Sequence, residues 1–231
     1  VKDISIKEQR RRIWSCLYSH EYHLSLMQGR PLQYIFSNED MSTSLPSSMD
    51  ENELWTTNPS MYLGCIERAR LLKVFHELWY GCDRASRSSP TKCIKLCEAL
   101  DAAFKRMPKF LQTDISPSAL SHFLQENPWL PFMRYYLRWK HLWLVIYALR
   151  HLSFNSKPAS EDENTSPAFE RCRVLLSEAA QDTITSATNY INNNALTPFF
   201  AWNCTFFIFN AALVPLTNII TQEASSENYL W

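Results

Sequence analysis

Glycine is the residue that this chain lacks most. Only 3 of its 231 residues are glycine, whereas an average protein contains about 7%. Glycine supplies the tight turns of β-hairpins and the loops that enclose phosphates. Its scarcity argues against a β-rich fold. No two glycines lie close enough in the sequence to form a P-loop or a dinucleotide-binding fingerprint, so both kinds of nucleotide site are excluded.

An excess of charge of either sign is also absent. The 23 Lys and Arg residues equal the 23 Asp and Glu residues. A surface that follows nucleic-acid phosphates ordinarily carries a basic excess, so we expect no specific DNA binding by this chain itself. The seven cysteines are odd in number and widely spaced, and no signal-peptide pattern opens the chain. These features indicate free thiols in a reducing compartment.

Motifs for catalysis or metal binding are missing as well. No GxSxG or DDxxD sequence occurs. Cys16, His20 and His23 share one helix face, but a zinc ion would need a fourth ligand from elsewhere, so we interpret them as a polar seam. Cys93 and Cys97 have three residues between them rather than the two of zinc and redox motifs, and we expect small core residues. We predict no catalytic residue, no metal site and no cofactor in this chain.

What the sequence does contain is apolar residues at helical spacing almost throughout. We predict an all-α fold, an irregular bundle of about seven helices with no significant sheet, in a single domain over 1–231. Polar stretches at 32–58 and 155–167 are expected to be connections, the second a mobile loop. Proline at the first helical position marks four helix starts: Pro59, Pro90, Pro167 and Pro198. The expected helices are roughly 5–28, 59–78, 90–107, a short one after 117, 130–152, 166–192 and 198–220.

The first helix has an apolar face that we expect to be buried. Ile13, Leu17 and Leu24 define this face and Trp14 borders it. The three arginines at 10–12 turn to different sides of the helix, so we interpret them as a solvated or salt-bridged helix start. Ser5 and Glu8 fit a capping box, which predicts the beginning of the helix near Ser5.

The last predicted helix is uncharged for 22 residues, 199–220, which is long enough to span a membrane. Its asparagines and Pro215, without flanking basic clusters, favour instead the buried central helix of a bundle, and we predict no membrane partner. Buried asparagine amides need partners, which we expect on the neighbouring long helices, and Pro215 should kink or end the helix. Such a polar seam could hold a small effector. The expected effector site comprises Trp202, Asn203, Phe206 and Asn210.

Several motifs of the chain occur in a fixed order. The first group comprises Arg10, Arg11, Arg12, Trp14, Leu17, Tyr18, Leu24, Ser25, Gly29, Arg30 and Pro31, followed by "NEDMSTSLP" at 38–46. This group resembles the signature of the fungal-specific transcription factor domain, the middle homology region of fungal zinc-cluster (Zn2Cys6) regulators. Glu21-Tyr22 stands where that signature has an acidic residue followed by arginine. The segments 134–152, 172–184 and 198–215 are similar to later helices of the same domain, and the set is similar to galactose- and lactose-pathway activators of budding yeasts.

The resemblance implies the regulatory middle region of a nuclear transcription factor for metabolic genes, among them those of carbohydrate metabolism. It implies a piece of a larger protein that lacks the domain's N-terminal helices and the zinc cluster. Zinc, DNA contact and homodimerisation would then belong to the full-length protein. A small metabolite or a regulatory protein is the expected effector. The alternatives are a ligand-free helical interaction scaffold and, more remotely, an all-α enzyme.

Overall fold

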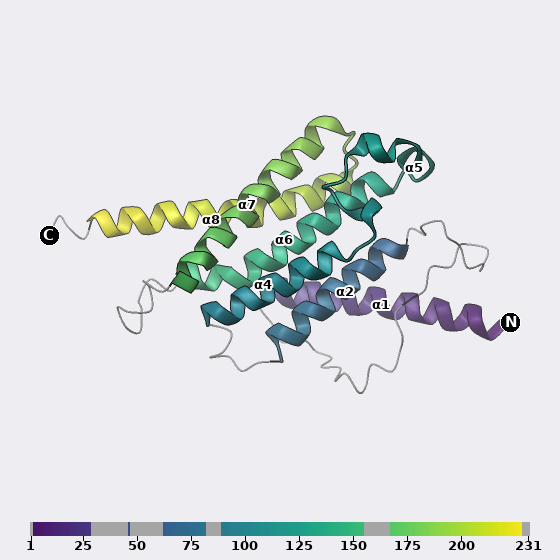
Figure 1. The fold of residues 1–231 in the computed structure, drawn as a ribbon, viewed down its shortest axis with the longest axis horizontal. Coiled ribbons are helices and arrows are strands. Elements are labelled where there is room, and N and C mark those ends of the chain that lie inside the picture. The colour runs from purple at the N-terminus through teal and green to yellow at the C-terminus, as the bar shows by residue number, and fades with distance from the viewer. Residues whose placement is uncertain (1, 29–45, 47–61, 82–88, 155–166, 228–231) are drawn as a thin grey trace. The chain divides into compact units, whose positions relative to one another are not determined.

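The computed structural model describes residues 2–28, 46, 62–81, 89–154 and 167–227 of the chain (Figure 1). Within these residues every regular element is helical, which confirms the all-α prediction. The connections expected at 32–58 and 155–167 fall almost wholly outside the described residues. The same holds for the helix end expected at Gly29 and for Arg30 and Pro31.

The described part of the chain contains seven α-helices and two short 3-10 helices. The predicted order of long helices is confirmed, and the main differences lie at their ends. The elements are α1 (Lys2–Gln28), α2 (Tyr62–Trp79), α4 (Pro90–Lys105), η1 (Lys109–Leu111), η2 (Pro117–Leu120), α5 (Ser121–Glu126), α6 (Leu130–Phe154), α7 (Pro167–Asn193) and α8 (Pro198–Glu227).

Proline begins three of the helices where the sequence predicts it: α4, α7 and α8. At α8 the preceding Thr197 also caps the helix, because its hydroxyl accepts a hydrogen bond of 3.3 Å from the Phe200 amide. The expected capping box at Ser5 is wrong, since α1 already begins at Lys2. Glu8, the other half of that box, instead binds arginines one turn further along the helix.

Two compact units make up the chain, Val1–Lys73 and Val74–Trp231, and the boundary falls inside α2. The prediction of one domain over 1–231 therefore stays a prediction. In the first unit two of the three clustered arginines are salt-bridged and Arg10 is exposed, which fits the expected solvated or salt-bridged helix start. Arg11 and Arg12 lie 3.5 Å and 3.3 Å from the carboxylate of the buried Glu8. The Arg12 guanidinium also lies over the Tyr62 ring, 4.0 Å from its centroid.

The second unit is organised around α6, which packs against α4, α7 and α8 (Figure 1). Trp139 of α6 is fully buried, and its indole nitrogen donates a 3.0 Å hydrogen bond to the Ser186 hydroxyl of α7. Phe132, about two helical turns before Trp139, stacks on Phe200 of α8 with ring centroids 4.1 Å apart. Burying these large rings supplies the apolar area that holds the helices together.

The face of α1 that the sequence predicts to be buried is exposed, so this prediction is wrong. Ile13 and Leu17 are 61% and 60% exposed, and Leu24 is exposed too, while Trp14 is half-buried. The buried side of the helix carries smaller and polar residues. Its members are Glu8, Ser15, Ser19, Tyr22, Ser25 and Leu26. Periodicity shows which residues share a face, but α1 has apolar residues on both sides, and tertiary packing decides which side is covered.

The central position predicted for α8 is also wrong. Trp202 and Phe209 are 73% and 62% exposed. Only one side of the helix packs against α6 and α7, the side with Cys204, Phe207, Ala211 and Val214. The helix is apolar all round, which suggested burial all round, yet it lies at the edge of its unit. It continues past Pro215 to Glu227, so the proline does not end it.

Among the described helices, Pro198–Ile220 is long and apolar enough to cross a membrane, with a mean hydropathy of 1.6 over a window that is 22% buried. This is the segment for which the sequence predicts no membrane role. The low burial removes the argument on which that prediction rested, and the prediction itself stays open. Binding of α8 to a lipid surface is therefore one of the outcomes of the experiment on this helix.

Candidate functional site

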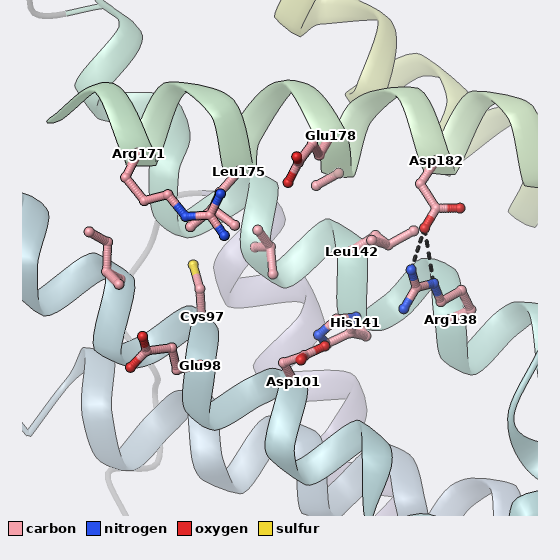
Figure 2. A pocket seen from close by; sticks show the side chains of 13 residues that line it. Cys97, Glu98, Asp101, Arg138, His141, Leu142, Arg171, Leu175, Glu178 and Asp182 are labelled. Atoms are coloured by element: carbon pink, nitrogen blue, oxygen red, sulfur yellow. Dashed lines mark hydrogen bonds and ion pairs between the residues drawn. The ribbon is translucent and has the colours of Figure 1, made fainter. Parts of the chain in front are cut away.

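A pocket of about 260 Å³ lies between α4, α6 and α7 (Figure 2). It combines an apolar base with an unusual number of charged side chains. Figure 2 shows Cys97, Glu98 and Asp101 of α4 on one wall and Arg171, Glu178 and Asp182 of α7 on the other, with Arg138, His141 and Leu142 of α6 between them. A small polar molecule in this pocket would contact all three helices.

One charged pair closes the pocket at the Asp182 end. The Arg138 guanidinium donates two hydrogen bonds to the Asp182 carboxylate, the one from Nε at 3.1 Å. These residues lie on α6 and α7, so the pair joins two of the three helices that line the pocket. Asp101 on α4 is engaged differently, with its carboxylate 2.6 Å from the Lys105 ammonium. The Arg138–Asp182 pair is a charge-assisted link between two walls, whereas the Asp101–Lys105 pair lies within α4.

His141 lies at the centre of the site. Its side chain is buried, and its ring stacks on Phe104 with centroids 5.1 Å apart and planes tilted by 25°. Neither ring nitrogen forms a hydrogen bond with any other protein group in the described part of the chain. A buried polar group left in this condition costs about 1–3 kcal/mol. A ligand hydroxyl or amine that reached the imidazole would recover that free energy.

The imidazole is neutral at physiological pH. Burial, aided by the neighbouring Arg138 and Lys105 and opposed by Asp101, lowers the pKa of His141 to about 4. In the neutral form one ring nitrogen donates and the other accepts. His141 can therefore recognise a group that both accepts and donates a hydrogen bond, and a hydroxyl does both.

Three other charged residues of the pocket are not engaged by the protein. Glu98, Arg171 and Glu178 form no ion pair or hydrogen bond with other described residues. Two carboxylates and one guanidinium thus remain for a ligand. This set suits a small polar molecule with an ammonium group toward a glutamate, and a carboxylate or hydroxyl toward the arginine.

The cysteine in the wall is a thiol rather than a nucleophile. Burial, aided by the nearby Cys93 and Cys172, raises the pKa of Cys97 to about 12. A thiolate is the reactive form, so this residue is inert at neutral pH. Cys93 and Cys97 are both buried, which confirms their expected place in the core.

The residues predicted from the sequence as an effector site do not come together in this pocket. Trp202 is exposed, and Asn203, Phe206 and Asn210 are half-buried along α8. The amides of Asn203 and Asn210 donate 2.8 Å hydrogen bonds to the carbonyls of Phe199 and Phe206 in their own helix. The prediction that their partners lie on neighbouring helices is therefore wrong. Asn210 alone lines a separate cavity of about 140 Å³ between α6, α7 and α8.

Sequence reasoning missed the pocket because its residues lie on three helices. A signal was nevertheless present. Arg138 and His141 interrupt a long aromatic helix, and Glu178 and Asp182 lie one turn apart on the next. Charged residues on a face that must be buried point to a satisfied network or to a site. The sequence alone does not tell which α4 residues face them.

Comparison with known proteins bears on the first half of the chain. The family model described as "Fungal specific transcription factor domain" matches residues 1–130. The match extends from α1 to the first residue of α6, so it includes the α4 wall of the pocket. It confirms the resemblance that the first helix indicated. No solved structure matches the chain.

Proposed function

Because the chain belongs to the family of the fungal specific transcription factor domain, we propose that it controls a zinc-cluster transcription factor by binding a small polar metabolite. The chain is thereby a regulatory region of a fungal transcription factor. Beyond this family role, we propose that a small effector binds in the pocket between α4, α6 and α7. The observation that supports this proposal most is the buried His141 at the wall of a polar pocket, whose ring nitrogens have no partner in the part of the protein that the structure describes.

A ligand in this pocket would act by bridging helices. It would touch Glu98 on α4, His141 on α6 and Glu178 or Arg171 on α7. A ligand shifts a conformational equilibrium only by its different affinity for the two states. The ligand would bind more tightly to the conformation in which the three helices pack as described than to a conformation in which one of them has moved.

The cellular setting follows from the family and is part of the proposal. We place the full-length protein in the nucleus, with DNA contact and zinc supplied by a zinc-cluster domain outside this chain and with homodimers as the DNA-binding form. Metabolic genes, including those of carbohydrate metabolism, are the expected targets. The regulatory role itself needs no enzymatic activity.

Thermal denaturation in the presence of amino acids, amino sugars, sugars and lipids tests the effector. A true ligand at about 100 times its dissociation constant should stabilise the chain by about 2.7 kcal/mol. His141→Phe keeps a ring against Phe104 and should abolish the shift, and Glu178→Gln should weaken binding of an amine. Asn210→Ala, in the other cavity, is the control and should leave the shift unchanged.

A second candidate function is a ligand-free scaffold that binds proteins. The exposed apolar side of α8 favours it, because large exposed apolar surfaces mark interaction sites. A screen without any stabilising compound would favour the scaffold. A ligand whose shift survives His141→Phe but is lost in Asn210→Ala would contradict the placement in the α4–α6–α7 pocket while leaving a sensor function intact.

A further inference from the structure

The exposed side of α8 is a continuous apolar seam. Its residues follow one another at alternating intervals of three and four, the spacing at which one helix packs into another. The α8 seam comprises Phe199, Trp202, Phe206, Phe209, Leu213, Leu216 and Ile220. Phe206 is half-buried against Trp143 and Phe207, and the other six are among the exposed large hydrophobic residues of the chain.

The α8 seam lies on the other side of the helix from the one that holds α8 to its unit. The packed side has its own alternation of four- and three-residue steps, through Cys204, Phe207, Ala211 and Val214. The helix thus has two apolar rows with this spacing: the packed side faces the interior of the unit, and the α8 seam is mostly exposed. The α8 seam contacts α6 only at its margin, where Phe199 and Phe206 meet Phe132 and Trp143, and most of its large side chains are exposed.

The flanks of the α8 seam have little polarity. No Asp, Glu, Lys or Arg occurs between Pro198 and Gln222. The amides of Asn203 and Asn210 are turned back onto carbonyls of their own helix, with donor–acceptor distances of 2.8 Å. One N–H of each amide is thus satisfied within α8, and the second N–H and the amide oxygen remain available to an amide of a facing helix.

We propose that the α8 seam pairs with the α8 seam of a second copy of this chain. An uncharged seam meets no like-charge repulsion when it faces itself, and a two-fold axis presents the same patch from both copies. Self-pairing also requires nothing from another protein, since each copy carries the matching heptad spacing.

The exposed area is a large part of what a stable dimer buries. Phe199, Trp202 and Phe209 are 63%, 73% and 62% exposed. With about 150–250 Å² for each aromatic side chain, these three contribute on the order of 300–500 Å² per copy. Three aliphatic residues of the seam add to this. A standard interface buries about 800 Å² per partner, so the α8 seam provides much of one.

Sedimentation equilibrium of the chain at rising concentration tests the proposal. The wild-type chain should form dimers, and Phe209→Glu should be monomeric, because it places a carboxylate in the middle of the seam. Val174→Glu is the matched control, since Val174 is an exposed apolar residue of α7 outside the seam, and it should dimerise like the wild type. Circular dichroism checks that each variant is folded, and Leu216→Glu replaces Phe209→Glu if the latter is not.

Two further measurements distinguish a second copy of the chain from a lipid surface as the partner of the α8 seam. Hydroxyl-radical footprinting should show Trp202 protected in the dimer and reactive in the Phe209→Glu monomer. Flotation with neutral phosphatidylcholine vesicles tests a lipid surface. A wild-type chain that stays monomeric at every concentration overturns the proposal, and so does a dimer that Phe209→Glu leaves intact. Monomeric wild type that floats with vesicles, while Phe209→Glu does not, assigns the seam to a membrane.

Discussion

Buried polar side chains join the helices of the second unit at defined points. The Trp139 indole is hydrogen-bonded to Ser186, and the guanidinium of the buried Arg134 donates to the carbonyls of Gln112 and Ile115. Each such group is satisfied by an element distant in sequence. His141 differs, because it is equally buried and neither of its ring nitrogens has a partner among the described residues. This contrast singles it out as a binding residue.

The titration of His141 should appear in the stability of the chain. Its pKa is about 4 in the folded state, against 6.5 for an ordinary histidine. The unfolded chain therefore binds the extra proton first as the pH falls from about 6.5. Stability from this residue is fully present above that pH and is lost on the way down to about pH 4. The loss amounts to about 3 kcal/mol, at 1.36 kcal/mol for each unit of pKa.

Urea denaturation of the wild type and of His141→Asn across this range isolates the effect. Other charged groups near the ring, among them Asp101, Lys105, Arg138 and Glu178, stay the same in both proteins and cancel in the difference. The unfolding free energy of the wild type minus that of His141→Asn should decrease as the pH falls from about 6.5 to about 4. His122→Asn, at an exposed position of α5, is the control. Parallel curves for wild type and His141→Asn would show that the imidazole is not held neutral.

At the scale of elements, the sequence predicts the helices but not the sides on which they pack. Helix order, proline starts and the core position of Cys93 and Cys97 follow from local patterns, because spacing and caps are local properties. The buried side of α1 and the edge position of α8 do not follow, since both helices have apolar residues around most of their circumference. Only neighbours from elsewhere in the chain decide which side is covered. The pocket escapes prediction for the same reason.

A pair of identical substitutions on α1 checks its buried side. Leu26 is 1% exposed and Leu17 is 60% exposed, although the sequence favours Leu17 as the core residue. Leu26→Ala should destabilise the chain by about 2–5 kcal/mol, because it removes buried methyl groups and leaves a cavity. Leu17→Ala should stay within about 0.5 kcal/mol of the wild type. Denaturation midpoints measure both, and equal large losses would mean that Leu17 is buried in solution.

At the scale of the whole molecule, charge balance limits what the chain does by itself. The 23 basic and 23 acidic residues give a formal net charge of zero. Part of the basic charge is already engaged, as Arg11 and Arg12 are with Glu8, and Arg138 with Asp182. Arg11 and Arg12 of the family signature thus bind a carboxylate of their own helix, while Arg10 is exposed.

We accordingly expect the chain to show no sequence-selective binding to duplex DNA. Specific complexes have dissociation constants of about 10⁻⁸–10⁻¹¹ M at physiological salt, and much of that affinity comes from basic residues that displace counterions. Fluorescence anisotropy with labelled duplexes should detect at most weak binding, equal for all sequences and abolished by added salt. A salt titration is the control, because nonspecific electrostatic binding falls steeply with ionic strength. Selective binding near about 10 nM that survives physiological salt would mean that the helical chain itself reads DNA.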